Sequence, residues 1–479
     1  MEKSLPDQKI SGPTLVMKFG GTSVGSPDAM RQVVEIVQSN QHKWPRLVVI
    51  TSALSGVTDL LLKSAQQAAS GKEQTCKEAA GELQDLHREI ADELISDLGL
   101  RNRAMLEIEQ LTASFSHFCQ AIAILGEATP RALDAIASIG ERLSVRLLSP
   151  AIQSIGLPAR YIESTRLIVT DDHYQSAYPD LAATSQKTRD VLEPLLEAGN
   201  IPVITGFIGA TKDGITTTLG RGGSDYSAAI IGTVLPADEV WIYTDVDGVM
   251  SADPRLVPEA QTIPVLSFKE VGELAYYGAK VLHPKTIRPV IDAGISIRVV
   301  NTFNPTHPGT RLVAESLLTG SRIIKAVTAI RKLQLITIEG RGMLGVPGVA
   351  ARTFSTVAAT GTNVTLITQA SSEQSICFAT PMESTGEVVR ALEATFAQEI
   401  SCQDIDRVWA TSEVAIITVV GVGMRNTPGI AGLVFSALGV NNINVIAIAQ
   451  GSSEVSISIL IDAGDTQKAV QAIHRLIVD

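Results

Sequence analysis

An apolar strand leads into glycines and hydroxyls at Leu15-Val16-Met17-Lys18-Phe19-Gly20-Gly21-Thr22-Ser23-Val24-Gly25-Ser26. Gly20 and Gly21 carry no Cβ atom, so the N–H groups of a tight turn can face an anion beside the N-terminus of the next helix. Lys18 adds a positive charge. Because the lysine precedes the glycines, the segment has neither the Walker A nor the dinucleotide-binding spacing. Taken alone, it is as compatible with an ordinary turn as with a phosphate site.

The length and composition predict a globular protein of several domains. A chain of 479 residues exceeds the size at which one hydrophobic core stops growing, so two or three domains are expected. Hydrophobic residues make up 45% and charged residues 19% of the chain, which argues against extensive disorder.

The charge and the cysteines restrict partners and location. The formal net charge is -11 and no Lys/Arg-rich run occurs, which makes nucleic acid and anionic membranes poor partners. The N-terminus has no apolar signal core, and no long apolar run predicts a membrane span. The cysteines are scattered, without metal-ligand spacing, so reduced thiols in a cytoplasmic protein are expected. They are Cys76, Cys119, Cys377 and Cys402.

The first two thirds of the chain reads as an α/β domain. Short apolar runs separated by helical patterns predict a mainly parallel sheet with helices on both faces, a three-layer αβα arrangement over residues 1–310. Residues 57–148 lack strand patterns and predict a helical subdomain. In such a sheet, ligands bind at the carboxyl ends of the strands. The runs lie at 47–51, 201–205, 240–244 and 297–301.

An internal repeat occupies the remainder. Residues 333–373 and 414–454 share a strand, a Pro-Gly turn, a helix and a second strand, offset by 81 positions. This order predicts two ferredoxin-like units, at 320–410 and 411–479. The second copy has no closing strand, so we expect residues 323–330 to help complete the sheet in an interleaved arrangement.

A second glycine cluster occurs at Gly220-Arg221-Gly222-Gly223-Ser224-Asp225, before a helix. An arginine offers a planar fork for a carboxylate or phosphate. Ser224 or Asp225 alone could be the N-cap of the helix. The whole cluster, which repeats the logic of the first segment, favours a functional role.

Three further motifs are less specific. The string Thr244-Asp245-Val246-Asp247-Gly248 lacks the spacing of a calcium loop and fits a turn that lines a nucleotide, or a plain turn. His283, before a proline, fits a structural role. Glu141 lies inside a helical region, where a glutamate is either solvated or functional.

Six ordered motifs resemble those of the aspartate kinases, in the amino-acid kinase fold, over essentially the whole chain. They are KFGGTSVGS, TSALSGVTDLL, GERLS, GFIGATKDGITTTLGRGGSDYSAA, YTDVDGVMSADPR and GAKVLHPKTI. The repeat resembles paired ACT domains, and its strings are most similar to the threonine-sensitive type of aspartate kinase–homoserine dehydrogenases. Because the sequence ends at Asp479 without a dehydrogenase part, a monofunctional enzyme is expected.

The resemblance implies transfer of the ATP γ-phosphoryl to the β-carboxylate of L-aspartate, which gives 4-phospho-L-aspartate, the first step of lysine, threonine and methionine biosynthesis. A carboxylate is ionised at neutral pH and needs no general base, so catalysis requires alignment and charge neutralisation. Lys18 would stabilise the transferring phosphoryl with Gly20 and Gly21, and Asp225 would orient the lysine or the nucleotide. Mg²⁺ would be held by the ATP phosphates, without a dedicated metal site.

The resemblance also assigns the remaining ligand contacts. Arg221 would bind the α-carboxylate of aspartate, Glu141 its ammonium, and Thr51 and Ser52 would supply hydroxyls. Met250 stands where the family commonly has tyrosine. The ATP contacts implied are Ser224, Thr244, Asp245, Met250, Arg255 and Lys280.

For the repeat, the resemblance implies feedback control by an amino acid, threonine and/or lysine, and assembly into a homodimer or larger. The helices after Gly348 and Gly429 offer free N–H groups to a carboxylate. Gln369 and Gln450 could read the effector, or could be exposed polar residues. The matching positions are Gly348, Asn363, Ile367 and Gln369, and Gly429, Asn444, Ile448 and Gln450.

Two other functions are compatible with the sequence. One is another amino-acid kinase, acting on glutamate, acetylglutamate, a nucleotide or carbamate. The other is a catalytically silent amino-acid sensor that keeps the fold. The presence of Lys18, Arg221 and Asp225 argues against the sensor.

Overall fold

The chain forms two compact units in the computed structural model. The structure describes residues 11–72, 74–279, 282, 284–314, 323–343, 346–369, 374–422, 424, 427–450 and 455–478. The first unit comprises Met1–Val249, Thr262–Phe268 and Leu282–Leu318, and the second comprises Met250–Gln261, Lys269–Val281 and Thr319–Asp479. Two short segments inside the predicted 1–310 domain are therefore grouped with the repeat.

The first unit is built on an eight-stranded sheet in the order β3-β5-β2-β1-β8-β10-β11-β9. Its strands pair in parallel except β10 with β11. The mainly parallel sheet expected from the apolar runs is confirmed. The strands are β1 (Thr14–Phe19), β2 (Arg46–Thr51), β3 (Ala159–Ile162), β5 (Ile201–Thr205), β8 (Glu239–Thr244), β9 (Val265–Ser267), β10 (Ser296–Asn301) and β11 (Thr310–Val313).

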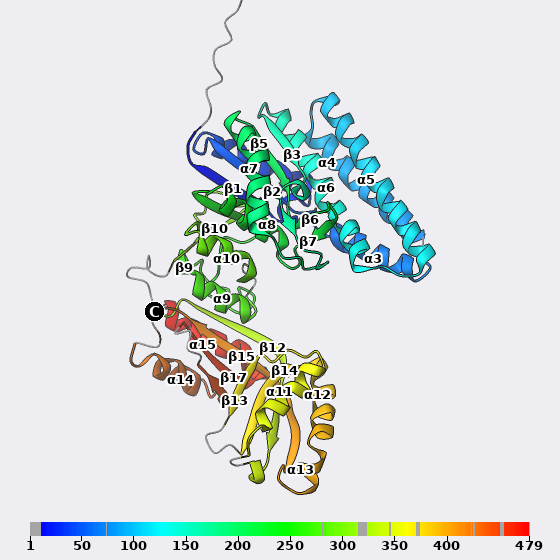
Figure 1. The fold of residues 1–479 in the computed structure, drawn as a ribbon. Coiled ribbons are helices and arrows are strands. Elements are labelled where there is room, and N and C mark those ends of the chain that lie inside the picture. Colours follow the sequence, from blue (N-terminus) through cyan, green and yellow to red (C-terminus); the bar gives the residue numbers. More distant parts are fainter. Residues whose placement is uncertain are drawn as a thin grey trace, which may run out of the picture. The chain divides into compact units, whose positions relative to one another are not determined.

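Helices cover both faces of this sheet (Figure 1). One layer contains α2 (Pro27–Gln41) and α6 (Pro130–Ser154), which share an apolar core with β1 and β2. The other contains α7 (Leu181–Glu197), α8 (Gly223–Val234) and α10 (Pro284–Asp292). The three-layer αβα arrangement is thus confirmed.

The register brings three strand ends to one edge. Phe19 pairs with Thr51, and Thr51 pairs with Thr205. Because these strands are parallel, the segments that follow them emerge side by side. A separate three-stranded sheet consists of β4 (Val169–Thr170), β6 (Ile208–Thr211) and β7 (Thr216–Thr218). The short helix α1 (Gly21–Val24) follows β1.

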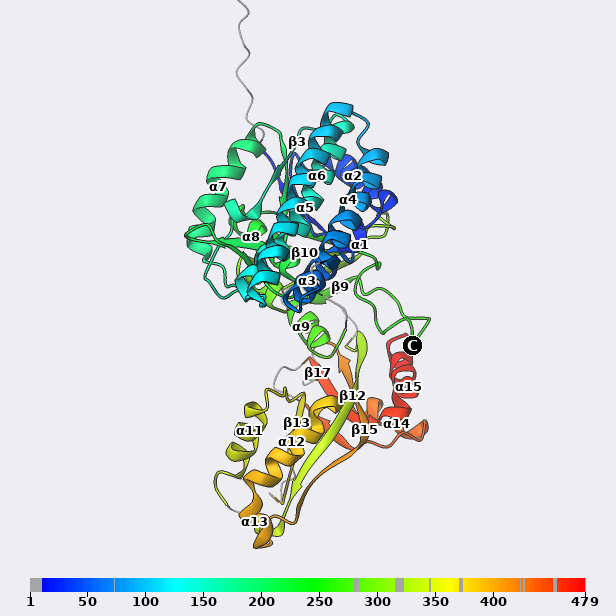
Figure 2. The same cartoon turned by 90° about the vertical axis from the view of Figure 1, so that its right-hand side faces the viewer.

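Three helices pack outside α6 and form the helical subdomain: α3 (Val57–Ala69), α4 (Gln74–Leu94) and α5 (Leu98–Leu125). Helices α4 and α5 lie side by side (Figure 2). This packing brings Cys76 and Cys119 to a Cα separation of 6.3 Å, where they form a disulfide. The expectation that all four cysteines are reduced was therefore wrong for this pair, because helix packing joins thiols 43 residues apart. Cys377 and Cys402 are free.

His87 of α4 is fully buried, and its Nδ1 lies 2.6 Å from the Leu83 carbonyl oxygen. Desolvation lowers the pKa of His87 from 6.5 to about 4, although the bond to Leu83 opposes the shift. The folded protein therefore keeps this imidazole neutral where the unfolded chain protonates it.

We expect acidification from pH 6.5 to pH 4 to destabilise the fold through His87. The unfolded state binds this proton first, so the free energy of unfolding falls by up to about 3 kcal/mol as the pH drops through that window. Urea unfolding of His87→Gln is expected to show a shallower pH slope than the wild type. Exposed His173→Gln is the control, and equal slopes for wild type and His87→Gln would contradict the prediction.

The second unit contains a six-stranded antiparallel sheet in the order β13-β14-β12-β15-β17-β16. The strands are β12 (Ala326–Glu339), β13 (Leu366–Gln369), β14 (Ser375–Pro381), β15 (Arg407–Val420), β16 (Ala447–Ala449) and β17 (Ser456–Asp462). The helices are α9 (Phe268–Tyr276), α11 (Val349–Ala359), α12 (Met382–Thr395), α13 (Ala397–Ser401), α14 (Ile430–Val440) and α15 (Thr466–Val478). Helices α11, α12, α14 and α15 pack on one face. The other face carries an apolar cluster that includes Leu335 and Ile416, and Tyr277, directly after α9, packs against it.

The long strands β12 and β15 are shared between the two repeat copies. Val327 at the start of β12 packs in the core of the second copy, whereas Ile336 near its end packs in the core of the first. In β15, Val408 near the start packs in the core of the first copy, and Ile417 near the end packs in the core of the second. Each copy therefore uses part of a strand whose other part belongs to its neighbour.

No helix in the described part of the chain combines the length and the apolar character that crossing a membrane requires.

Candidate functional site

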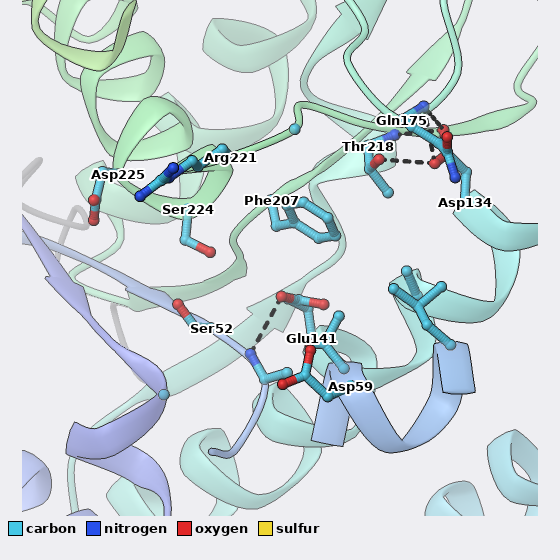
Figure 3. Close-up of a pocket in the computed structure, with 18 of the residues that line it drawn as sticks. Ser52, Asp59, Asp134, Glu141, Gln175, Phe207, Thr218, Arg221, Ser224 and Asp225 are labelled. Atoms are coloured by element: carbon cyan, nitrogen blue, oxygen red, sulfur yellow. Dashed lines mark hydrogen bonds between the residues drawn. The ribbon is translucent and has the colours of Figure 1, made fainter. Parts of the chain in front are cut away.

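A pocket of about 530 Å³ opens at the edge where β1 and β2 end. All of its lining residues belong to the first unit, and the volume suits a small-molecule ligand. Segments far apart in the sequence converge on it (Figure 3). Seven residues predicted from the sequence line this pocket: Lys18, Gly21, Ser52, Glu141, Arg221, Ser224 and Asp225.

Lys18 and Asp225 form an ion pair across the sheet, with 2.6 Å between Nζ and Oδ1. Lys18 lies near the end of β1, and Asp225 lies in the first turn of α8, which packs on β1. Their side chains are 11% and 19% exposed, so the pair is largely shielded from water. The N-cap of α8 is Gly222, in the left-handed region at φ 70°. This excludes the alternative that Ser224 or Asp225 caps the helix.

Close backbone approach explains the glycines at this edge. A Cβ atom on Gly21 would lie 3.0 Å from the carbonyl oxygen of Ala53, and one on Gly206 would lie 2.7 Å from Cβ of Ser224. The Gly20 N–H donates to the Tyr243 carbonyl oxygen at 3.3 Å. Gly20 therefore links β1 to β8, and Gly21 lines the pocket.

Glu141 of α6 presents an incompletely satisfied carboxyl group to the pocket. The side chain is buried, and Oε1 accepts a hydrogen bond from the Ala53 N–H at 3.3 Å. Oε2 is buried without a hydrogen-bond partner among the described residues. Burial raises the pKa of Glu141 to about 8, against the effects of the Ala53 hydrogen bond and the Lys18 charge. A cation placed beside Oε2 would favour the ionised form.

Arg221 supplies an accessible cation to the pocket, and its side chain points toward Asp225, away from Phe207 and Glu141 (Figure 3). Its side chain is exposed and has no ion-pair partner among the residues that the structure describes. Positive φ angles at Gly220 (76°) and Gly222 (70°) shape the loop that carries it. The pocket therefore offers a carboxyl group on one side and a guanidinium group on the other.

Several predicted residues lie outside this lining. Thr51 is buried, and its Oγ1 lies 2.9 Å from Oγ of Ser144. Thr244 ends β8 and Asp245 follows it, and the Thr244 hydroxyl donates to Asp245 Oδ1 at 3.1 Å. Met250 and Arg255 belong to the second unit, and Arg255 pairs there with Asp253. Lys280 and His283 lie outside the described residues.

Other lining residues were not predicted from the sequence. They include Asp134, Gln175, Phe207, Thr218, the loop residues 53–56, and Thr58 and Asp59 at the start of α3. Asp134 gave one usable signal. It precedes Glu141 by seven residues in the same helix, a spacing that returns to the same helix face. Residues 53–59, Phe207 and Thr218 lie within motifs that carry the family resemblance, but no property of the single residues marked them as pocket residues. Gln175 lies outside those motifs.

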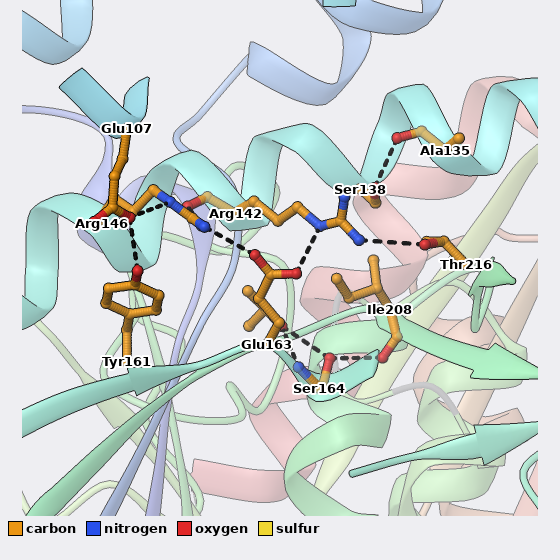
Figure 4. Close-up of polar contacts among 11 residues, drawn as sticks. Glu107, Ala135, Ser138, Arg142, Arg146, Tyr161, Glu163, Ser164, Ile208 and Thr216 are labelled. Atoms are coloured by element: carbon orange, nitrogen blue, oxygen red, sulfur yellow. Dashed lines mark hydrogen bonds and ion pairs between the residues drawn. The ribbon is translucent and has the colours of Figure 1, made fainter. Parts of the chain in front are cut away.

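Two arginines of α6, Arg142 and Arg146, hold this helix in place (Figure 4). Arg142 pairs with Glu163 at 3.1 Å and donates to Thr216 Oγ1 at 3.2 Å. Arg146 pairs with Glu163 and with Glu107, each at 2.9 Å. These contacts join α6 to α5, to the segment after β3 and to β7. The helix that carries Glu141 is therefore tied to three neighbouring elements.

The predicted effector residues of the second unit occupy equivalent places in the two copies. Gly348 and Gly429 are the N-caps of α11 and α14, each with φ 92°. Gln369 ends β13 and Gln450 follows β16. The side chains of both glutamines are exposed, as are those of Asn363, Asn444, Ile367 and Ile448.

Family comparisons cover both units. Residues 13–301 match the family model described as the amino acid kinase family, and residues 336–396 and 417–476 match the ACT domain. The resemblance of the two repeat copies to ACT domains is thereby confirmed.

Two plant proteins are similar along nearly the whole chain. The chloroplastic bifunctional aspartokinase/homoserine dehydrogenase 1 of Zea mays is 37% identical over 462 residues, which are 96% of this chain and 50% of that protein. The chain thus spans about half the length of the bifunctional relatives that it matches. The chloroplastic aspartokinase 1 of Arabidopsis thaliana is 32% identical over 484 residues, 97% of this chain and 80% of that protein.

A bacterial enzyme is similar in structure. Aspartokinase III of E. coli in complex with aspartate and ADP has a TM-score of 0.78 and 29% identity, covering 97% of this chain and 100% of that one. Its complex with lysine and aspartate has the same TM-score and coverage, at 30% identity.

Proposed function

The chain belongs to the aspartokinases of the amino acid kinase family, and we propose that it transfers the γ-phosphoryl group of ATP to the β-carboxylate of L-aspartate, giving 4-phospho-L-aspartate. The observation that carries this proposal is the pocket in which the Lys18–Asp225 pair lies with Glu141 and Arg221. The relatives named as aspartokinases, and the complex of one of them with aspartate and ADP, support the choice of substrates.

The acceptor chemistry explains why the pocket needs cations more than a base. The β-carboxylate of aspartate is ionised at neutral pH, so no proton has to be removed before attack. The cost of the reaction is bringing two negative groups together in line. Lys18 neutralises charge on the transferring phosphoryl group, and Asp225 holds the lysine in position through the 2.6 Å ion pair.

The remaining charges suit the head group of an α-amino acid. Glu141 has a buried oxygen without a hydrogen-bond partner, and the ammonium group of aspartate would supply the missing partner. Arg221 is exposed, and its planar fork binds the α-carboxylate in two parallel hydrogen bonds. Ser52 and Ser224 add polar groups to the lining.

ATP enters as the magnesium complex, and the Mg²⁺ ion neutralises charge on its phosphates. The described residues include no group of three or more His, Cys, Asp or Glu side chains that could hold a metal ion. That the metal is held by the ATP phosphates stays a prediction. Thr244, Asp245, Met250, Arg255 and Lys280 stay predicted ATP contacts.

The two ACT units support feedback regulation by an end-product amino acid. We propose the threonine-sensitive type, and lysine, which is present in one complex of the E. coli enzyme, is the other candidate. A homodimer or larger assembly, a cytoplasmic location, and a role at the start of lysine, threonine and methionine biosynthesis are further parts of this proposal.

A trapping assay tests the proposed activity. Purified protein is incubated with MgATP, hydroxylamine and one amino acid at a time, and acyl phosphate is measured as hydroxamate. Hydroxamate is expected with L-aspartate. Hydroxamate with glutamate but not with aspartate would favour another amino-acid kinase. If none of the tested amino acids gives hydroxamate, a catalytically silent sensor is favoured.

Replacing Gln369 or Gln450 with alanine is expected to weaken inhibition by the effector. Loss of a hydrogen bond to a charged or polar ligand costs about 1–3 kcal/mol, so the inhibitor concentration at half activity should rise by roughly 5- to 160-fold in the copy that binds. Activity is titrated with threonine, with lysine and with both together. Gln398→Ala, an exposed glutamine of α13, is the matched control. Unchanged inhibition in both single variants and in the double variant would refute this effector site.

A further inference from the structure

Asp134 is a second buried carboxylate of α6, and the catalytic roles assigned above do not use it. Its side chain lines the pocket but is only 1% exposed. Oδ2 accepts hydrogen bonds from the N–H groups of Thr218 at 2.9 Å and Gln175 at 3.0 Å. Oδ1 accepts from the Thr218 hydroxyl at 2.8 Å and from the Gln175 N–H at 3.1 Å. All of these partners are donors, as an ionised carboxylate requires.

These bonds connect two segments that border the pocket (Figure 3). Thr218 ends β7, and its carbonyl oxygen accepts from the Ala177 N–H at 2.9 Å. Gln175 has a positive φ of 68°, a conformation that a residue with a side chain adopts only when its surroundings hold it there. The Asp134 carboxylate therefore joins the segment 171–178 to the end of β7.

The loop that carries Arg221 starts at this anchor. Arg221 follows Thr218 by three residues, and the Leu219 N–H between them donates to the Phe207 carbonyl oxygen at 2.8 Å. Gly220 packs so closely on the other segment that a Cβ atom there would lie 3.0 Å from the carbonyl oxygen of Gln175. A shift of Thr218 or Gln175 would thus move the backbone on which Arg221 is mounted.

The other end of the connection is Glu141. Asp134 and Glu141 lie seven residues apart on one face of α6, and the pairs of Arg142 and Arg146 with Glu163 fix the position of that helix. The helix therefore fixes the distance between the two carboxylates. Glu141 faces the ligand, and Asp134 holds the loop that carries Arg221 at a set distance from Glu141.

We propose that Asp134 is a positioning residue that sets the spacing between Glu141 and Arg221, and thereby the affinity of the site for the paired ammonium and α-carboxylate of its amino-acid substrate. This inference rests on the proposed function. Burial raises the pKa of Asp134, while the hydrogen bonds from Gln175 and Thr218 lower it. The hydrogen bonds of the carboxylate do the positioning, so a neutral group of the same shape can replace it.

The test separates aspartate binding from ATP binding. In Asp134→Ala, the KM for aspartate is expected to rise by about tenfold or more, as for the loss of a buried charge-assisted contact, while the KM for ATP and kcat stay within about threefold. In Asp134→Asn, the side-chain oxygen can still accept hydrogen bonds from the N–H groups of Thr218 and Gln175, and the side-chain NH₂ group can donate to the Thr218 hydroxyl. This variant should therefore recover most of the affinity for aspartate. The control Asp171→Ala removes another anchor of the segment 171–178, which accepts from His173 and Tyr178 but not from Thr218.

Each failure has its own signature. No acyl phosphate from the wild-type protein and aspartate would contradict the proposed function, and this inference with it. If the wild-type protein turns over aspartate normally, two results would overturn this inference alone. One is an unchanged KM for aspartate in folded Asp134→Ala, and the other is an equal rise of the KM values for aspartate and ATP in that variant. If the alanine variant does not fold, Asp134→Glu keeps the charge but lengthens the arm. An aspartate KM equal to that of the wild type in this variant would likewise overturn the proposal.

Discussion

Lys18→Ala is expected to lower kcat by roughly 10³- to 10⁵-fold, the range observed when a cation that stabilises phosphoryl transfer is removed. Lys18 is shielded from water, with a side chain 11% exposed, so its charge acts at low local dielectric and solvent cannot replace it. The loss should appear in kcat more than in the KM for aspartate, because the lysine acts on charge that moves during the transfer. Single-turnover formation of hydroxamate measures it.

The matched control is the surface pair Lys212–Asp180, in which the lysine side chain is 74% exposed. Lys212→Ala removes the same type of residue from the same type of pair and should leave kcat near the wild-type value, because exposed pairs contribute little. Circular dichroism shows whether Lys18→Ala stays folded. Turnover like that of the wild type in the folded Lys18→Ala protein would remove Lys18 from the mechanism.

Glu141→Gln is expected to raise the KM for aspartate by roughly 30- to 5,000-fold, because truncating one partner of a buried charge pair costs about 2–5 kcal/mol. The same change should stabilise the free protein at pH 8. Burial raises the pKa of Glu141 from 4.5 to about 8, so between these values the unfolded chain loses a proton that the folded protein keeps. Wild-type stability should therefore fall as the pH rises from 4.5 to 8, by on the order of 4–5 kcal/mol, and the glutamine variant should lack this loss.

The substrate affinity should depend on pH in the opposite sense. An ammonium group binds the ionised form of Glu141, so the apparent affinity of the wild type for aspartate should rise with pH up to about 8, by at most about tenfold per pH unit. In Glu141→Gln this dependence should be absent. Exposed Glu127→Gln, in the loop before α6, is the control. An aspartate KM in Glu141→Gln equal to that of the wild type, with the same pH profile, would exclude contact between Glu141 and the ammonium.

Local patterns were sufficient for the strands and for the main charged residues of the pocket. The apolar runs of β2, β5, β8 and β10 are buried in the sheet, and strand ends in a parallel sheet share one edge. From this rule and the two glycine clusters, Lys18 and Asp225 could be expected to meet, and they form an ion pair. Arg221 and Glu141 were predicted from the resemblance of their motifs, and both line the same pocket.

Contacts between distant segments could not be predicted in this way. Asp134 is flanked by Leu133 and Ala135 without any motif, and its partners lie 41 and 84 residues away. Thr51 ends β2 and Ser52 follows it, yet only Ser52 lines the pocket, because the Thr51 hydroxyl lies 2.9 Å from the Ser144 hydroxyl in α6. The disulfide between Cys76 and Cys119 depends on how α4 packs against α5.

Residue order alone therefore accounts for the fold class, the repeat and the charged groups at the strand ends, because hydrophobic periodicity, glycine geometry and charge are properties of short segments. Packing decided the rest. The burial that raises the pKa of Glu141, the donors that surround Asp134 and the strands shared by the two ACT units all arise where segments far apart in the chain exclude water together. Those arrangements depend on the tertiary contacts, which no short segment contains.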